Sequence, residues 1–248
     1  MTTTVLITGA NKGIGRGLVQ KYLARPETTV IAAVRSPKST DSKSLADLPT
    51  DNTSRLITIK IDASSNTDAH DAVKTLEKHD IASLDIVIAN AGVVDATAFV
   101  PVAEVKITQL QDYLDVNTVG PVRLFQATLP LLRKSSRARF ILMSSLLATI
   151  SDAKDIPFPI GAYGASKAAA NFLVQKIDFE NEGIATLAVN PGSVKTASGN
   201  EAARAVGFPE AAVELHESVD AIVAKIDMLS KGNGSAQFWG IDGTIAPW

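Results

Sequence analysis

Short runs of apolar and β-branched residues recur along the chain, separated by longer stretches in which apolar residues repeat at helical spacing. The apolar runs cover Val5 to Thr8, Thr29 to Val34, Leu56 to Ile61, Asp85 to Ala89, Arg139 to Ser144 and Ala185 to Asn190, with a last short run near Ala236 to Trp239. They are apolar almost throughout instead of alternating, which is typical of strands buried on both faces of a sheet. The helical spacing predicts helices over Gly13 to Arg25, Asp68 to His79, Gln109 to Leu132, Ala165 to Glu182 and Val219 to Leu229.

Strand and helix alternate from one end of the chain to the other. This order predicts an α/β fold, a single-domain doubly wound (Rossmann-type) parallel sheet of about seven strands, with right-handed crossovers and helices on both faces. No repeat and no shift of composition divides the 248 residues, so we expect one domain over residues 1–248. The segment from Ser36 to Ser54 is rich in Ser, Asp, Lys and Pro, which favours a mobile surface connection.

Composition and charge exclude several classes of protein. With 46% hydrophobic and 20% charged residues the chain can build a core, which excludes a disordered protein. A net charge of -2 leaves no large basic footprint for nucleic acid or anionic lipid, so we expect small molecules or copies of the chain as partners. The absence of cysteine excludes disulfides and thiolate chemistry. Without a basic flank before Val5, or a run of roughly 18 apolar residues, we expect no signal peptide, no membrane span and a cytoplasmic location.

Three glycines stand where the first strand meets the first helix, in the run Gly9-Ala10-Asn11-Lys12-Gly13-Ile14-Gly15. In a doubly wound sheet this junction is where a pyrophosphate binds, because glycine allows a tight turn and the helix N-terminus presents free N–H groups. An ordinary strand-to-helix turn is the alternative interpretation.

The glycine spacing, T-G-x-x-x-G-x-G, resembles that of the short-chain dehydrogenase/reductase family, and further family motifs follow in order. They are Asn90-Ala91-Gly92, Asp115-Val116-Asn117, Ser144-Ser145, Tyr163-Gly164-Ala165-Ser166-Lys167 and Pro191-Gly192. The resemblance covers essentially the whole chain. The stretch before Tyr163 and the ending Phe238 to Gly243 with Pro247-Trp248 resemble the small carbonyl-reductase branch, which includes norsolorinic-acid-type ketoreductases.

The second strand ends without a carboxylate before Asp41, although enzymes that select NAD usually carry one there. Arg35 offers a guanidinium fork that matches a phosphate, and Lys12 could reach the same group. Two solvated surface cations are the alternative interpretation. We therefore predict NADP(H) as the cofactor.

The resemblance implies further cofactor contacts. Asp62 would accept from the adenine amino group, unless it caps the following helix, for which Ser64 and Ser65 are rivals. The complete predicted cofactor site consists of Gly9, Asn11, Lys12, Gly13, Ile14, Gly15, Arg35, Asp62, Ala63, Asn90, Ala91, Gly92, Tyr163, Lys167, Pro191, Gly192, Val194 and Thr196.

Four residues form the predicted catalytic set. Lys167 lies one helical turn after Tyr163, so its ammonium is expected to lower the pKa of the phenol and make Tyr163 a general acid. Ser145 would hydrogen-bond the substrate carbonyl, with Ser144 as a structural neighbour. The resemblance implies that Asn117 kinks its helix and holds a water that links Lys167 to solvent. The alternative for Tyr163 and Lys167 is an exposed pair on a helix surface, and the alternative for Asn117 is a polar helix residue that faces solvent.

The three histidines, His70, His79 and His216, fall outside these motifs, so we expect neither a serine nucleophile nor a metal site.

These residues predict an NADPH-dependent carbonyl reductase that acts on a ketone or aldehyde. The apolar run Ile156 to Ile160, with Phe158, favours bulky hydrophobic or aromatic substrates, unless it is a subunit contact or a plain loop. The segment from Ala197 to Ser218 is expected to be a flexible cover over the substrate. The alternatives are a hydroxysteroid or alcohol dehydrogenase, an acyl-carrier-protein ketoreductase and a non-catalytic NADP(H)-sensing protein. A homo-oligomer, dimer or tetramer, is implied by the family.

Overall fold

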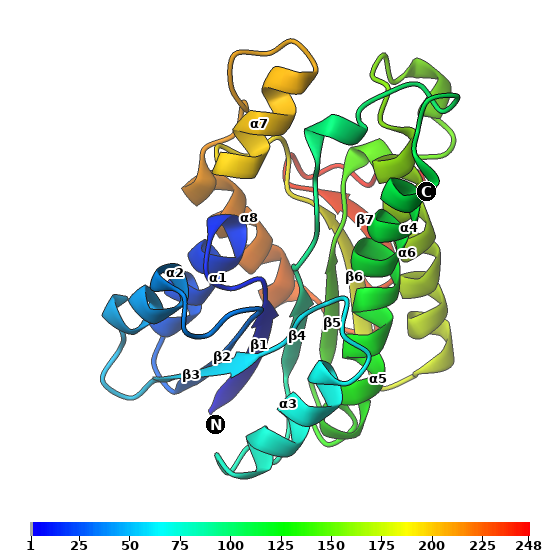
Figure 1. Ribbon diagram of the computed structural model, residues 1–248. Coiled ribbons are helices and arrows are strands. Elements are labelled where there is room, and N and C mark those ends of the chain that lie inside the picture. Colours follow the sequence, from blue (N-terminus) through cyan, green and yellow to red (C-terminus); the bar gives the residue numbers. More distant parts are fainter. Residues whose placement is uncertain (1) are drawn as a thin grey trace.

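Seven parallel strands form one sheet in the computed structural model, which describes residues 2–248 (Figure 1). The strand order is β3-β2-β1-β4-β5-β6-β7. Each predicted strand is present within two residues of its expected ends: β1 (Thr3–Thr8), β2 (Thr28–Val34), β3 (Arg55–Lys60), β4 (Ile86–Ala89), β5 (Arg139–Met143), β6 (Ala185–Asn190) and β7 (Gln237–Gly240). The doubly wound parallel sheet predicted from the sequence is confirmed.

The sheet order reverses between β1 and β4. The chain moves outward from β1 to β3 and then returns to place β4 on the other side of β1, where Val5 is paired with Ile86. In such a sheet, ligands bind in the crevice outside the carboxyl ends of the strands at this switch point. The residues that follow β1 and β4 therefore mark the expected site.

Helices cover both faces of the sheet (Figure 1). They are α1 (Gly13–Leu23), α2 (Thr40–Lys43), α3 (Asp68–Glu77), α4 (Ile107–Leu114), α5 (Gly120–Leu132), α6 (Gly161–Glu180), α7 (Ala197–Ala205) and α8 (Leu215–Met228). A π-helical turn, Asp115–Val119, joins α4 to α5. Short 3-10 turns lie at Ser44–Asp47, Ala96–Ala98, Leu146–Ala148 and Ala153–Asp155.

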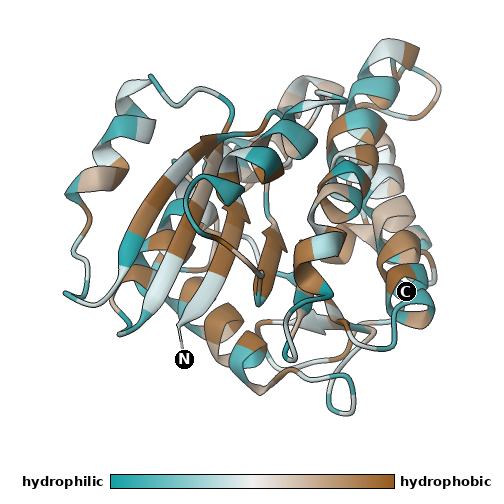
Figure 2. Cartoon of the chain, turned by 90° about the horizontal axis from the view of Figure 1, so that it is seen from below, coloured by the Kyte–Doolittle hydropathy of each residue, from teal (hydrophilic) through white to brown (hydrophobic). Residues whose placement is uncertain are grey.

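The core consists of two apolar layers, one on each side of the sheet. Leu6 packs in the layer under α3, α5 and α6, whereas its neighbours Val5 and Ile7 pack in the layer under α1 and α8. Figure 2 shows the hydrophobic residues in brown along the strands and on the helix faces that turn toward them. Because successive side chains of a strand point to opposite faces, both layers need apolar residues, and this explains the nearly continuous apolar runs.

Two predictions about the first half of the chain need correction. β3, one of the two edge strands, alternates between exposed and buried positions instead of being apolar throughout. The segment from Ser36 to Ser54 contains α2 and a 3-10 turn instead of irregular connection alone. Leu45 is buried in the core, and Arg16 of α1 donates a hydrogen bond to the Ser44 hydroxyl at 3.0 Å.

Two predictions about the second half also change. The helix expected over Gln109 to Leu132 is divided by the π turn, which places one extra residue in the turn around Asn117. The expected cover, Ala197 to Ser218, contains α7 and the first residues of α8. The cover is hydrogen-bonded to the segment that follows β6. The Val213 amide donates to the Ser193 carbonyl and the Val213 carbonyl accepts from the Lys195 amide, both at 2.8 Å.

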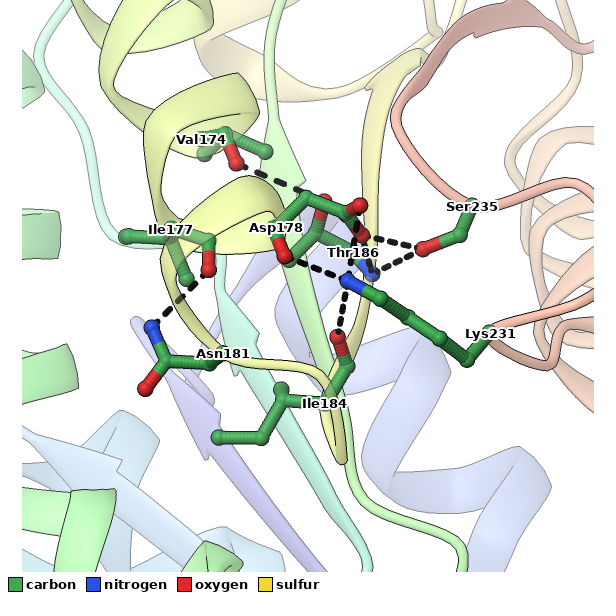
Figure 3. Close-up of polar contacts among 8 residues, drawn as sticks. All are labelled: Val174, Ile177, Asp178, Asn181, Ile184, Thr186, Lys231 and Ser235. Carbon is green, nitrogen blue, oxygen red and sulfur yellow. Dashed lines mark hydrogen bonds and ion pairs between the residues drawn. The ribbon is translucent and has the colours of Figure 1, made fainter.

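A polar cluster secures the edge strand β7 at the end of the sheet opposite the strands' carboxyl ends (Figure 3). The Asp178 carboxylate of α6 accepts a hydrogen bond from the Thr186 backbone amide in β6 at 3.2 Å and pairs with Lys231 at 2.8 Å. The Ser235 hydroxyl also donates to Asp178, and Lys231 donates to the Ile184 carbonyl at 3.3 Å. The segment before β7 is thereby fixed against α6 and β6.

Within residues 2–248, no helix is both long enough and apolar enough to cross a membrane.

Candidate active site

The glycine-rich turn between β1 and α1 is as tight as the sequence predicts. Gly9 and Gly13 have positive φ angles of 63° and 51°, a conformation that side chains with a Cβ rarely adopt. A Cβ added to Gly15 would lie 2.2 Å from the Gly9 carbonyl oxygen, so only glycine fits there. Asn11, Lys12 and Ile14 complete the turn, and Ile14 packs against the core.

The ends of β1 and β4 brace this turn. The Asn90 side-chain amide donates to the Thr8 carbonyl at 2.8 Å, and the Thr8 hydroxyl accepts from the backbone amides of Asn90 and Ala91, both at 3.0 Å. Asn90 and Ala91 are thus brought together with the glycine turn. Thr8 was not predicted as a site residue, although the T-G pair of the motif was the available signal.

The N-terminus of α1 is open toward this turn. Lys12, at the N-cap, makes no side-chain cap, and the first turn of the helix contains no acidic residue. Unpaired amides and the positive end of the helix dipole favour an anion there. A Cβ on Gly13 would lie 3.3 Å from the Thr196 methyl group, so the predicted Thr196 faces the same turn. These observations fit a dinucleotide pyrophosphate.

Lys12 and Arg35 are both exposed, and neither side chain has an ion-pair or hydrogen-bond partner within residues 2–248. Arg35 directly follows the last residue of β2, and no carboxylate precedes Asp41. Both cations are therefore free to meet a phosphate at this edge of the sheet.

A small pocket lies beside the ends of β3 and β4 and is lined by Asp62, Ala63, Ala91, Gly120 and Arg123 among others. Asp62 accepts from the Ser64 amide and hydroxyl through Oδ1 at 3.1 and 2.8 Å. It does not cap the next helix, which begins at Asp68, and Ser65 instead accepts from the Asp68 amide at 3.1 Å. The helix-cap interpretation of Asp62 was therefore wrong, and the carboxylate lines the pocket.

Tyr163 and Lys167 lie on α6, near the end of β5. The Lys167 ammonium donates to the Met143 carbonyl at 2.8 Å and lies 5.9 Å from the centre of the Tyr163 ring. Ser145 follows β5 and accepts from the Leu147 amide at 3.2 Å, and its side chain lies near the Tyr163 phenol, whose pKa it lowers. Ser144 turns away into the interior, where it donates to Asn171 at 2.6 Å. Ser145, Tyr163 and Lys167 thus lie close together at the end of β5.

Burial dominates the electrostatics of this group. It raises the pKa of Tyr163 to about 12, although the nearby Ser145 lowers that pKa in part. It also lowers the pKa of Lys167 to about 8, because an ammonium loses hydration in the interior. The expectation that Lys167 lowers the pKa of Tyr163 is therefore corrected: desolvation outweighs any such effect, and the phenol is protonated at neutral pH.

Asn117 lies in the π turn and is completely buried. Its Oδ1 accepts from the Val93 amide at 2.8 Å, and its amide nitrogen donates to the Val93 carbonyl and the Ser166 hydroxyl, both at 3.1 Å. Both hydrogens of the Asn117 side-chain amide are thereby used within the protein. Only carbonyl oxygens, which accept hydrogen bonds, therefore remain to hold a water at this position. A Cβ on Gly92 would lie 3.0 Å from Asn117 Oδ1 and 3.4 Å from Lys167 Nζ, which places the three residues together.

Supporting residues that sequence reasoning missed position the centre. The buried Tyr113 ring packs edge-on against Tyr163 with centres 5.9 Å apart, and its hydroxyl donates to the Asp95 carbonyl at 2.9 Å. Asn190, at the end of β6, accepts from the amides of Leu146 and Gly192 at 3.2 and 3.4 Å. No motif marks Tyr113 or Asn190, because Asp95 lies 18 residues from Tyr113 and Leu146 lies 44 residues from Asn190.

The segment after β6 passes next to the glycine turn. Gly192 has a positive φ of 78°, the Pro191 carbonyl accepts from Ser218 at 2.8 Å, and Val194 is buried. Lys195 pairs with Glu210 and Glu214 at 2.9 and 2.8 Å.

An aromatic contact joins this cover to the stretch before α6. The Phe158 and Phe208 rings meet edge to face with centres 6.2 Å apart. The apolar run around Phe158 therefore touches the cover.

The three histidines are exposed, and within residues 2–248 no group of three or more candidate side chains could hold a metal ion. The predicted absence of a metal stays a prediction.

Residues 3–207 match the sequence profile of the short chain dehydrogenase family. The chain belongs to this family. The short-chain dehydrogenase is 41% identical to a norsolorinic acid ketoreductase of Dothistroma septosporum over 99% of the chain and 92% of that protein. It is 40% identical to the norsolorinic acid ketoreductase of Aspergillus parasiticus over 99% of the chain and 91% of that protein. The structure of NADPH-bound carbonyl reductase from chicken fatty liver matches with a TM-score of 0.87 and 28% identity, covering 100% of this chain and 99% of that one. The predicted resemblance to the carbonyl-reductase and norsolorinic-type branch is confirmed.

Proposed function

We propose that residues 1–248 form a catalytic domain that uses NADPH to reduce the carbonyl group of a bulky hydrophobic or aromatic ketone. The observation that carries this proposal is the position of Ser145, Tyr163 and Lys167 beside a glycine turn that fits a pyrophosphate. When bound, NADPH supplies the hydride for the carbonyl carbon. The carbonyl reductase from chicken fatty liver, which binds NADPH, supports this choice of cofactor.

The chain's own residues supply placement and the proton. Ser145 donates a hydrogen bond to the carbonyl oxygen and polarises it, and Tyr163 gives its hydroxyl proton to that oxygen. A pKa of about 12 keeps Tyr163 protonated at neutral pH, which favours reduction over alcohol oxidation. Lys167 would hold the nicotinamide-side ribose and return a proton to Tyr163 through a water at Asn117.

Other residues bind the cofactor. The glycine turn and Thr196 would hold the pyrophosphate, Asn90, Ala91 and Gly92 would line the path of the ribose, and Pro191, Gly192 and Val194 would hold the carboxamide. Asp62 and Ala63 would contact the adenine in the pocket that they line beside β4. Lys12 and Arg35 would bind the 2′-phosphate as unpaired cations.

The proposed substrate class rests on apolar side chains around the reacting centre. Leu146 and Ile150, which closely follow Ser145, are 43% and 70% exposed, and Phe208 of the cover is 54% exposed. Phe158 contacts Phe208. Such surface gains about 25 cal/mol for each Å² that a ligand removes from water. The relatives named for norsolorinic acid support a large ketone.

The first experiment measures cofactor oxidation with ketones of increasing size, with NADPH and NADH in parallel. We expect turnover with NADPH and rising kcat/KM with apolar substrate size. Tyr163→Phe should lower kcat at least about a hundredfold while NADPH still binds. Tyr22→Phe is the matched control, since Tyr22 is buried on α1 and its hydroxyl has no partner within residues 2–248. A folded Tyr163→Phe enzyme with full turnover contradicts the assignment.

The second experiment tests cofactor selection. Arg35→Asp should raise KM for NADPH at least about tenfold and change KM for NADH little, because it removes a charge-assisted contact and adds repulsion. Lys38→Asp makes the same charge change at an exposed residue three positions further along and serves as the control. A wild type that prefers NADH contradicts this part of the proposal.

The homo-oligomer, dimer or tetramer, and the cytoplasmic location stay predictions. Light scattering on the purified protein measures the first.

A further inference from the structure

Arg123 of α5 binds two separate parts of the site at once. Its side chain is 16% exposed and uses all three guanidinium nitrogens. Nε donates to the Asn66 side chain at 2.8 Å and Nη1 to the Ala63 carbonyl at 2.9 Å. Nη1 also donates to the Asp115 carbonyl at 3.2 Å, and Nη2 pairs with the Asp115 carboxylate at 2.7 Å. One rigid group therefore connects two segments whose contact residues are 49 to 52 positions apart in the sequence.

The first of these segments, residues 62–67, forms one wall of the pocket assigned to adenine. Asp62 and Ala63 line the pocket, and Arg123 lines it as well. The segment also rests directly on the start of α5, since a Cβ on Gly120 would lie 3.1 Å from the Ala63 Cβ and 3.2 Å from its carbonyl oxygen. A ligand that orders residues 62–67 therefore also fixes the Asn66 side chain and the Ala63 carbonyl, to which Arg123 donates.

The second segment is the π turn that contains Asn117. The Asp115 carbonyl accepts a hydrogen bond from the Gly120 amide, five residues later, and Arg123 provides its second donor. Asp115 begins the turn, and Asn117 follows two residues later. π turns are rare in helices, and this one has contacts from outside its own backbone. Arg123 provides two such contacts.

We propose that Arg123 is a positioning residue that couples adenine binding to the placement of Asn117. This inference rests on the proposed function, because it assigns the pocket to adenine and Asn117 to proton return. Because the guanidinium is planar and rigid, it cannot move toward one segment without lengthening its hydrogen bonds to the other. Adenine binding thus stabilises the π turn, and the intact π turn strengthens adenine binding, since coupling between sites is reciprocal.

The decisive experiment breaks one side and measures the other. Calorimetry with 2′,5′-ADP reports the adenine end without nicotinamide or turnover. Asp115→Ala, which touches neither Ala63 nor Asn66, should raise the Kd for 2′,5′-ADP at least about fivefold. Asp112→Ala removes an exposed carboxylate one turn earlier on α4 and should leave the Kd unchanged. Asp115→Asn, which keeps an acceptor without the charge, should show a smaller effect and covers the case that Asp115→Ala does not fold.

The reverse experiment perturbs residues 62–67 and measures proton return. Asn66→Ala should lower kcat at saturating NADPH and change its solvent isotope effect, although Asn66 lies outside the reacting centre. Asn52→Ala, at another exposed asparagine, is the control. Arg123→Lys keeps a charge but loses the fork, so it should show both defects, like Arg123→Met.

The possible results separate the two proposals. If Asp115→Ala leaves 2′,5′-ADP binding unchanged, or Asn66→Ala leaves kcat and its isotope effect unchanged, Arg123 only supports the fold and the coupling is refuted. If the wild type binds 5′-AMP as tightly as 2′,5′-ADP, the NADPH assignment is wrong, and the same comparison of variants with 5′-AMP still tests the coupling.

Discussion

Replacing Lys167 by methionine separates the free energy of burying this ammonium group from its role at the reacting centre. Lys167 is only 6% exposed, and its ammonium has one hydrogen-bond partner within residues 2–248, the uncharged Met143 carbonyl, at 2.8 Å. The remaining attraction comes from the Tyr163 ring, 5.9 Å away. A methionine of similar length fills the same space without a charge. We expect Lys167→Met to lose activity and to gain stability.

The magnitude follows from the pKa of Lys167. Burial lowers it from 10.5 to about 8, which corresponds to about 3 kcal/mol of unfavourable free energy for the buried charged form. Losing the hydrogen bond to Met143 costs about 1 kcal/mol, so the net gain is about 2 kcal/mol near neutral pH. The wild type carries the full penalty below pH 8, where folded and unfolded chains both hold the proton. As pH rises from 8 toward 10.5, only the unfolded chain keeps it, so wild-type stability rises relative to the variant.

Urea unfolding at several pH values tests this reasoning, with the fluorescence of Trp239 and Trp248 as the signal. The stability difference between Lys167→Met and wild type should shrink by about 2 kcal/mol between about pH 6.5 and about pH 9.5, since other titrating groups cancel. Lys176→Met, on the same helix but with a side chain 45% exposed, is the control and should show no such trend. A Lys167→Met difference that is independent of pH, or a variant less stable than wild type at neutral pH, would refute the argument.

Three further predictions concern activity and binding. The rate of ketone reduction should fall as pH rises above about 8, because the protonated form of Lys167 is lost there, whereas Lys167→Arg should move this limb upward in a pH–rate profile. Gly15→Ala should raise the Kd for NADPH at least about tenfold, because overpacking costs about 1–3 kcal/mol; titration of cofactor fluorescence measures it, and Gly232→Ala, with open space around its Cβ, should bind normally. Phe158→Ala should lower kcat/KM more for aromatic than for short aliphatic ketones, with the exposed Phe179→Ala as control; equal losses on both substrates would mean that Phe158 supports the fold alone.

Local patterns along the chain were sufficient for the sheet and for the motif residues. Apolar runs predicted six of the strands because these strands are buried on both faces, and β3 was predicted from the apolar residues that it places on its buried face. The glycine turn was predictable because its conformational demand falls within a few consecutive residues. The spacing of Tyr163 and Lys167 was readable for the same reason, since one helical turn separates them.

The tertiary structure alone decided what holds these motifs in place and how they titrate. The bond from Asn90 to Thr8 joins residues 82 positions apart, and that from Leu146 to Asn190 joins residues 44 apart. Such partners depend on which strands become neighbours, which no local pattern specifies. The direction of the Tyr163 pKa shift also depended on burial. The sequence shows that the Lys167 charge is a neighbour, but it does not show that both groups lose their hydration in the folded protein. The spacing of residues in the sequence identified the catalytic residues, whereas packing between distant segments determined the pKa shifts of Tyr163 and Lys167.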